Sequence, residues 1–305
     1  IIAADVCIGY IINTDIITVD GNFASSATFA TDLLTLAAAS NITGTAGALN
    51  LAAGGGTDLL VRTNNGTVNL NNTGNDVETL AATVGGTNSF TFSDTDGFTV
   101  GSLTDDMGTV SGITAANGVT LTAGAGGAGL LNVTQDIATT NNNIVLNGVG
   151  VTVNAGASSV DSGMGDITID ANSGTFTLSD NAEILGESTI TITADAGIDI
   201  GTASSGTGTQ IGGTGTGTGN ATTVVIAADS ATQTMGIAGG AGTLSLLAVE
   251  LEDVRATNVR LGDTANTGAI TINAWTPVSR VAPGVLKLAS SAGITKGGAV
   301  DVLNR

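Results

Sequence analysis

A strict alternation of apolar and polar residues runs through residues 148–200 and limits this stretch to β-structure. Examples are Asp-Ile-Thr-Ile-Asp-Ala over residues 166–171 and Thr-Phe-Thr-Leu over residues 175–178. Successive side chains of a strand point to opposite faces, so a period of two gives each segment one buried and one solvated face. Glycine, asparagine, serine and aspartate fill the gaps and indicate turns. We therefore predict short strands separated by tight turns.

The alternation also predicts which side chains face inward. The residues expected in a shared core are aliphatic and occupy every second position: Val151, Val153, Ile167, Ile169, Ile190 and Ile192. The residues expected to face solvent lie between them: Thr152, Thr168 and Thr191. Threonine is favoured on the solvated face of strands.

The same strand unit recurs along the chain. The segment at Ile167 is followed 23 residues later by the one at Ile190, and similar segments between residues 49 and 289 lie at intervals averaging close to 24 residues. That length is typical of one coil of a parallel β-solenoid, in which stacked coils bury a continuous core. We predict an all-β fold, a parallel β-solenoid (β-helix) of roughly a dozen coils, with Gly-rich loop insertions at residues 123–129 and 206–219.

Composition supports this fold and argues against an ordinary globular enzyme. Of 305 residues 46 are glycine, while only 3% are aromatic and 11% are charged. No segment shows a clear helical period, which an enzyme of this size would have. Residues 33–39 are the one place where a short helix is credible, and by length they could equally form a buried strand.

Residues 1–47 and 48–305 are predicted to differ in role. The first segment is apolar and strand-forming, and an uncovered apolar edge of this kind promotes aggregation. We expect it to cap the fold or to pair with a neighbouring subunit, the intersubunit residues being Ile2, Val6, Ile8, Ile11 and Ile16. The alternative is that these strands are simply the first layer of their own solenoid, which occupies residues 48–305.

The net charge of −19 is unevenly distributed. Residues 1–254 hold 24 carboxylates and one basic residue, whereas residues 255–305 carry a charge of +4. A surface this acidic excludes nucleic-acid binding over most of its area. The basic end favours head-to-tail association of identical chains, with Arg255, Arg260 and Arg280 expected to meet carboxylates of the next copy.

Three further features concern disulfide formation, membrane insertion and processing of the chain. Cys7 is the single cysteine, so an internal disulfide is excluded and only an intermolecular one could form. We expect a small buried thiol there, beside Val6 and Ile8. No apolar run of about 18 residues exists, so no membrane span is expected. Because the chain begins without methionine or a basic leader, we expect a processed product or a section of a longer chain.

Three stretches resemble the repeats of very large bacterial exoproteins of the filamentous-haemagglutinin type. They are Asn-Gly-Thr-Val-Asn-Leu-Asn-Asn-Thr-Gly-Asn-Asp from residue 65, Phe-Thr-Phe-Ser-Asp-Thr-Asp-Gly from residue 90, and Gly-Val-Thr-Leu-Thr-Ala-Gly from residue 118. The resemblance covers roughly residues 48–200. It implies a right-handed parallel β-helix, export to the cell surface, and a role in adhesion or extracellular matrix.

The residue inventory excludes most catalytic schemes. There is no histidine, so neither a Ser-His-Asp triad nor a histidine metal site can be built. Two-carboxylate glycoside hydrolysis remains open in principle through Asp94/Asp96, Asp105/Asp106, Glu183/Glu187 and Glu250/Glu252/Asp253. Sugar-binding clefts usually contain several aromatic side chains that stack on the sugar rings, and this chain has only one tryptophan and one tyrosine. We predict a protein without enzymatic activity, the alternative being a polysaccharide-acting β-helix enzyme.

Calcium is the one cofactor that the sequence suggests. Asp94 and Asp96 precede a glycine, and Asp76 follows one closely, which places hard oxygen ligands beside tight turns. The glutamate that closes an EF-hand loop and the tandem Gly-Gly-x-Gly-x-Asp array are both missing. An Asx turn explains these residues equally well. A calcium-dependent binding module is therefore a second alternative.

Together these features predict a non-enzymatic structural protein. We expect a rod or head-to-tail filament that serves surface adhesion or matrix formation, located outside the cell or on its surface after bacterial-type secretion. The expected partners are further copies of the same chain and host or cell-surface glycans.

Overall fold

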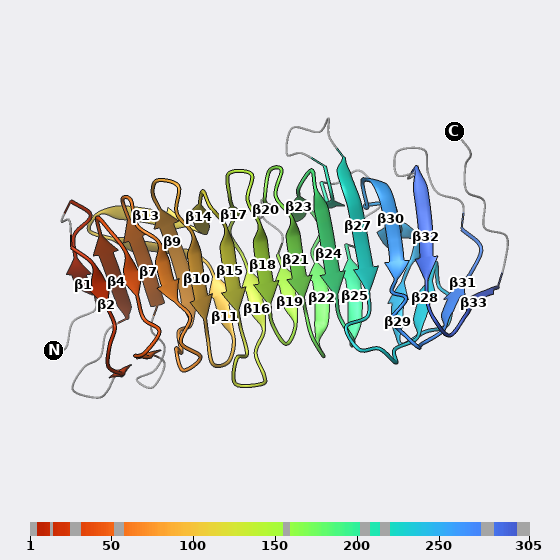
Figure 1. The fold of residues 1–305 in the computed structure, drawn as a ribbon, viewed down its shortest axis with the longest axis horizontal. Coiled ribbons are helices and arrows are strands. Elements are labelled where there is room, and N and C mark those ends of the chain that lie inside the picture. The colour runs from red at the N-terminus through yellow and green to blue at the C-terminus, as the bar shows by residue number, and fades with distance from the viewer. Residues whose placement is uncertain are drawn as a thin grey trace. The chain divides into compact units, whose positions relative to one another are not determined.

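The structure is a computed structural model of the 305-residue chain. It describes residues 5–12, 15–24, 32–51, 58–154, 159–201, 208–213, 220–275 and 284–297. These residues form a parallel β-solenoid of about ten turns with about 2% helix, which confirms the predicted fold class (Figure 1). The predicted dozen coils become about ten because some coils are long. Ile190 pairs with Val224, 34 residues later, and Val224 pairs with Val259, 35 residues later.

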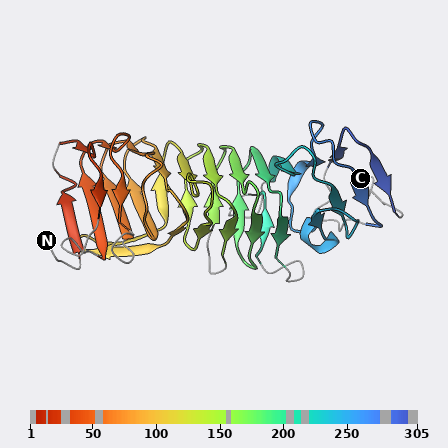
Figure 2. The ribbon, with the colours of Figure 1, turned by 90° about the horizontal axis from the view of Figure 1, so that it is seen from below.

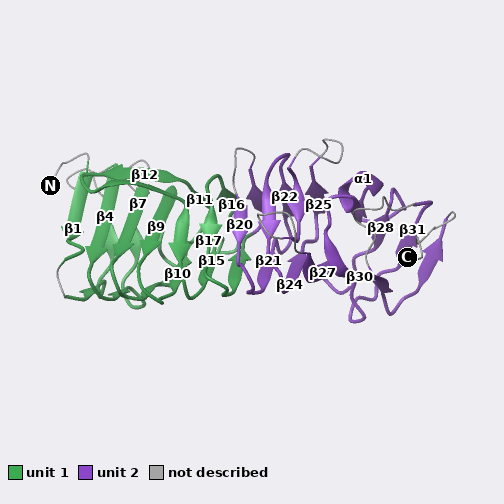
Figure 3. Cartoon of the chain, turned by 90° about the horizontal axis from the view of Figure 1, so that it is seen from above, with its two compact units in different colours: residues 1–148 green, residues 149–305 purple. Residues whose placement is uncertain are grey.

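The chain consists of two compact units, residues 1–148 and 149–305, which Figure 3 shows in green and purple. In the first unit, one parallel sheet begins with the strands β1 (Asp5–Gly9), β4 (Leu33–Ala38), β7 (Asp58–Thr63) and β9 (Thr79–Val84). The long strand β9 then pairs with two strands side by side. One is β11 (Phe98–Val100), which is followed by β16 (Leu131–Val133), and the other is β14 (Ile113–Ala115), which is followed by β17 (Ile137–Ala138). A second sheet has the order β2 (Ile17–Thr18), β5 (Ile42–Thr43), β8 (Val68–Leu70), β10 (Phe90–Ser93), β15 (Val119–Thr122) and β18 (Ile144–Asn147). A small sheet pairs β3 (Phe23–Ala24) with β6 (Leu49–Asn50).

The core of the first unit lies between these sheets. Its largest fully buried side chains include Phe90 and Phe92, whose positions in β10 alternate with half-buried threonine and serine. Phe92 meets Phe98 of the opposite sheet edge-to-face, with ring centroids 5.2 Å apart. An edge-to-face pair at this separation adds roughly 0.5–1.5 kcal/mol beyond the burial of its area. The alternation thus places the inward-facing apolar side chains of both sheets in a shared core.

One element of the first unit departs from the parallel coils. Strands β12 (Ser102–Asp105) and β13 (Gly108–Ser111) form an antiparallel hairpin that lies against β9 (Figure 3). Leu103 and Val110 of the hairpin cluster with Leu33, Leu60 and Ala81. The hairpin therefore covers an apolar patch on the outer face of the sheet, outside the main core.

In the second unit, the longest sheet has the order β21 (Ile167–Asp170), β24 (Thr189–Thr193), β27 (Ala221–Ala227), β30 (Ala256–Gly262) and β32 (Val285–Ala289). The facing strands are β19 (Val151–Val153), β22 (Thr175–Leu178) and β25 (Gly197–Ile200), with β20 (Ser159–Asp161), β23 (Glu183–Leu185) and β26 (Gln210–Ile211) beside them. The remaining strands are β28 (Met235–Ile237), β29 (Leu244–Leu246), β31 (Ile270–Ile272) and β33 (Ile294–Lys296). The short helix α1 (Ala248–Leu251) is seen in the C-terminal part of this unit (Figure 2).

The predicted inward and outward residues of the second unit are confirmed. All six predicted core residues are fully buried: Val151, Val153, Ile167, Ile169, Ile190 and Ile192. Thr152, Thr168 and Thr191 alternate with them and are only half-buried. Ile167 pairs with Ile190 and Ile169 with Ile192 in parallel register, so identical side chains stack from coil to coil.

Other local predictions have mixed outcomes. Residues 33–39, which allowed a helix or a buried strand, form the buried strand β4. The helix α1 arises where none was expected. The predicted loop at residues 123–129 contains no strand. Of the predicted loop at residues 206–219 only residues 208–213 are described, and there the prediction is wrong for Gln210 and Ile211, which pair with β23. Ile211 is fully buried, so this Gly-rich stretch contributes one aliphatic side chain to the core.

Candidate functional site

The acidic turn predicted to bind calcium is built around a buried carboxylate. Asp94 follows β10 and is fully buried. Its Oδ2 accepts a hydrogen bond from the backbone N–H of Val77 at 3.0 Å, and its Oδ1 accepts one from the backbone N–H of Asp96 at 3.1 Å. The second contact is an Asx turn, and the first joins two successive coils. Asp94 therefore has a structural role that satisfies both of its oxygens.

The other two predicted calcium ligands are more exposed. Asp76 is half-buried and Asp96 is exposed. Burial raises the pKa of Asp76, and the nearby negative charges of Asp96 and Glu78 raise this pKa further. Within the described residues, no group of three or more carboxylate, thiol or imidazole side chains is arranged to hold a metal ion. The geometry at Asp94 matches the Asx-turn alternative, and calcium binding stays a prediction.

Burial makes Asp94 a source of pH-dependent stability. It raises the pKa of Asp94 from 3.8 to about 8, although the N–H donors of Val77 and Asp96 oppose the rise. The folded chain therefore holds this proton more tightly than the unfolded chain does. Its contribution to stability is complete below about pH 4 and is lost as the pH rises towards 8. We expect the free energy of unfolding, measured in urea, to fall between pH 5 and pH 8.

The substitution Asp94→Asn should remove much of this slope, because the amide does not ionise. It should also lower stability at pH 5 by about 1–3 kcal/mol, since the amide nitrogen cannot accept one of the two N–H groups. The matched control is Asp161→Asn, in a turn where Asp161 Oδ1 accepts the N–H of Gly163 at 2.8 Å and the side chain is only half-buried. The control should keep the wild-type slope. Equal slopes in Asp94→Asn and wild type would contradict the assignment.

Two of the predicted intersubunit residues, Val6 and Ile8, lie on the edge strand β1 of the first unit. Among described strands β1 pairs only with β4, and Val6 and Ile8 stand in register with the buried Leu34 and Leu36. Val6 is nevertheless only half-buried, and Ile8 is 39% exposed. Cys7, which lies between them, is exposed, so the prediction of a buried thiol is wrong. Val6 and Ile8 occupy positions that face the core in the next coil, but they are partly exposed here because no further described coil covers them.

Two more predicted residues, Ile11 and Ile16, lie beside β1 and β2 rather than within them, and one cannot be placed. Ile16 is 57% exposed and Ile11 is half-buried. Ile2 lies outside the described residues. An apolar cavity of about 240 Å³ opens at this edge and is lined by residues that include Ile8, Ile17, Val19, Phe23, Leu36 and Leu49. Exposed apolar surface next to unpaired strand edges is a feature of surfaces that bind another chain.

The basic residues predicted to meet another copy are only partly available. Arg255 is half-buried. Arg260 forms an ion pair with Asp263 of its own chain, with Nη2 3.3 Å from Oδ2. Arg280 lies outside the described residues. Two lysines that the sequence analysis did not single out, Lys287 and Lys296, are exposed on the edge strands β32 and β33.

Two of the other carboxylates considered for catalysis, Asp105 and Glu250, have structural partners. Asp105 forms a two-point ion pair with Arg62, and Glu250 accepts the backbone N–H groups of Ile200 and Leu247. Burial raises the pKa of Glu250, while these two N–H donors lower it. A carboxylate that caps a helix start and joins it to β25 is a structural element.

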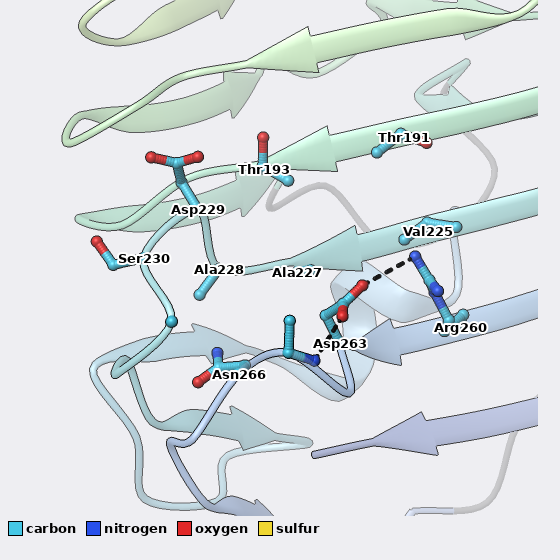
Figure 4. A pocket seen from close by; sticks show the side chains of 12 residues that line it. Thr191, Thr193, Val225, Ala227, Ala228, Asp229, Ser230, Arg260, Asp263 and Asn266 are labelled. Atoms are coloured by element: carbon cyan, nitrogen blue, oxygen red, sulfur yellow. Dashed lines mark hydrogen bonds and ion pairs between the residues drawn. The ribbon is translucent and has the colours of Figure 1, made fainter. Parts of the chain in front are cut away.

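A depression on the outer face of the second unit was not indicated by any sequence motif. It has a volume of about 230 Å³ and lies over β24, β27 and β30 (Figure 4). Val225, Ala227 and Ala228 form an apolar floor, with Arg260 and Asp263 on one side and Asp229 at one end. An apolar break in an otherwise threonine-rich outer face was the signal that could have indicated it.

Comparisons with known proteins do not identify a relative. The chain matches no family model, no curated protein and no solved structure. None of the helices in the described residues has the length and apolar character needed to cross a membrane.

Proposed function

We propose that this protein is a non-enzymatic structural protein of the cell exterior that assembles head to tail into a rod or filament for adhesion or matrix formation. The observation that carries the proposal is the pair of unpaired sheet edges. Within the described residues β1 and β2 each pair on one side only, and so do β32 and β33. Unpaired strand edges are templates for pairing with another chain.

The charges on these edges are opposite in sign. Asp5, Asp15 and Asp20 are exposed on and beside β1 and β2. Lys287 and Lys296 are exposed on β32 and β33. Opposite charges speed association and select one orientation of the two partners. A contact between unlike ends does not close on itself unless its rotation produces a ring, so repetition generates a filament.

The aliphatic positions of the two edges are also compatible. Leu286 and Leu288 of β32 stand in register with the buried Val259 and Leu261 of β30, yet both are only half-buried. Ile17 of β2 is half-buried as well. Pairing β32 of one copy with β2 of the next would cover these side chains and extend both cores, which adds hydrophobic stabilisation to the hydrogen bonds.

Deleting residues 1–20 should abolish assembly and leave folded monomers, because it removes β1, β2 and the three acidic residues. Sedimentation velocity at increasing protein concentration and electron microscopy of negatively stained samples would measure this. The double substitution Lys287→Glu/Lys296→Glu should weaken assembly of the full chain, and high salt should weaken wild-type assembly. A wild-type chain that stays monomeric at high concentration, or a deletion variant that still forms filaments, would contradict the proposal.

The absence of enzymatic activity is part of the proposal and is tested separately. The carboxylates Asp105 and Glu250 are occupied by structural contacts, which favours a structural role over hydrolysis. Incubation of the purified chain with neutral and acidic polysaccharides should release no reducing ends. Release of oligosaccharides would favour the polysaccharide-acting alternative.

A further inference from the structure

The outer face of the second unit changes character at β27. Thr191 and Thr193 of β24 stand in register with Val225 and Ala227 of β27, so apolar side chains replace hydroxyls at outward positions. Val225 is 6% exposed and Ala227 is 3% exposed, although both lie on the solvent side of the strand. The next residue, Ala228, is also buried. An outward residue this well covered marks the floor of a depression, and the surrounding side chains form its walls (Figure 4).

The polar groups around this floor leave bonding capacity at both ends. Arg260 lies in register with Val225, its side chain is 36% exposed, and among the described residues its guanidinium forms an ion pair through Nη2 alone, with Asp263. Asp229 lies at the other end, and within the described part of the chain its carboxylate has no hydrogen bond or ion pair. Nearby Asp170 and Asp195, by contrast, already accept hydrogen bonds from Thr193 and Ser230. The depression thus offers a donor at one end and an acceptor at the other, with an apolar surface between.

Charge and size restrict the ligand. Asp229 and Asp263 outnumber Arg260 among the lining residues. Burial raises the pKa of Asp229, and the negative charges of Asp170 and Asp195 raise this pKa further. This negative surrounding disfavours an anionic ligand. The volume of about 230 Å³ is below the roughly 300–1,000 Å³ of sites for drug-sized molecules. An open depression of this size accommodates one ring of a longer chain at the protein surface.

We propose that this depression binds one pyranose ring of a neutral or amino-bearing glycan. The C–H face of the ring covers Val225 and Ala227. A ring hydroxyl accepts a hydrogen bond from Arg260, and a hydroxyl or ammonium group at the other end donates one to Asp229. This inference rests on the adhesive part of the proposed function, for which it supplies a binding site and a ligand class.

The test uses the full 305-residue chain and three soluble hexasaccharides: an N-acetylglucosamine hexamer, a glucosamine hexamer and a galacturonic acid hexamer. Titration calorimetry and saturation-transfer NMR measure binding at millimolar ligand concentrations. We expect binding of the neutral hexamer, the amino-bearing hexamer or both, and no binding of the anionic one. Tighter binding of the glucosamine hexamer would indicate that an ammonium group donates to Asp229, and equal or tighter binding of the N-acetylglucosamine hexamer would indicate that a hydroxyl group does.

Two substitutions locate the site. Asp229→Asn and Arg260→Met should each weaken binding roughly tenfold or more, because each removes a charged hydrogen-bonding partner. The matched control is Asp199→Asn in another depression of the same unit, which is lined by Thr177, Asp180 and Asp199. It should bind like wild type. Thermal melting checks that the variants are folded. If Arg260→Met does not fold, Arg260→Lys replaces it in the test, because an ammonium group cannot hydrogen-bond to Asp263 and to a ligand in the planar geometry of the guanidinium.

Several results would overturn the inference. These are binding of the galacturonic acid hexamer as tight as that of the others, no binding of any hexamer, or equal binding by wild type and both site variants. Sedimentation of the same samples keeps the two proposals apart. Filaments that bind no hexamer would refute the glycan site alone, whereas monomers that bind would refute head-to-tail assembly and leave the site in place.

Discussion

Replacing Ile169 by aspartate is expected to lower the free energy of unfolding of the second unit by more than about 4 kcal/mol. Ile169 is fully buried in β21, and it pairs with Ile192 in the next coil. The substitution removes an aliphatic side chain and places a carboxylate where no described basic residue is adjacent. Because each coil of a solenoid is stabilised by its neighbours, the loss spreads to the adjoining coils.

The matched control is the neighbouring substitution Thr168→Asp, which adds the same carboxylate to the outward side of the same strand. Thr168 is half-buried, so the charge reaches water, and the change should stay within about 1 kcal/mol. Urea unfolding followed by circular dichroism would measure both variants. Similar losses for Ile169→Asp and Thr168→Asp would show that the two faces of β21 are not differentiated as the structure indicates.

The second large effect is expected at the ion pair that attaches the β12–β13 hairpin to the first unit. Arg62 Nη2 lies 2.9 Å from Asp105 Oδ1, and Arg62 Nε lies 3.1 Å from Asp105 Oδ2. The Arg62 and Asp105 side chains are 11% and 6% exposed. Thr35 Oγ1 also donates to Asp105, and the carbonyl oxygen of Gly108 accepts from Arg62 at 2.6 Å. Asp105→Leu should weaken docking of the hairpin by about 3–5 kcal/mol, because it leaves a buried guanidinium without its counter-charge.

The double substitution Arg62→Met/Asp105→Leu separates the pair from its surroundings. Replacing both charges by apolar groups removes the unpaired buried charge, so the double variant should be more stable than Asp105→Leu alone. Hydrogen exchange of the hairpin amides would measure docking of the hairpin, and urea unfolding would measure the stability of the first unit. A double variant as unstable as the sum of its single variants would mean that the two side chains are not coupled.

The alternation of apolar and polar residues was enough to predict short strands and the two faces of each strand. In residues 148–200 the alternation identifies each strand and assigns inward aliphatic and outward threonine positions, because a strand has no other period. The same signal predicts a solenoid, since strands this short bury a core only by stacking. It also left residues 33–39 open between helix and strand, because an unbroken apolar run has no period to distinguish the two.

The pairing of strands and the contacts of their side chains became known from the folded structure and could not be predicted from local sequence. Residues 102–111 alternate like any coil strand, yet they fold as an antiparallel hairpin over an apolar outer patch; period two does not distinguish these arrangements. The burial of Asp94, the contact of Arg62 with Asp105, and the depression between Asp229 and Arg260 each depend on residues separated by many positions in the chain. Coil lengths vary, so local sequence does not specify such registers. They are set by which inward side chains stack in the folded core.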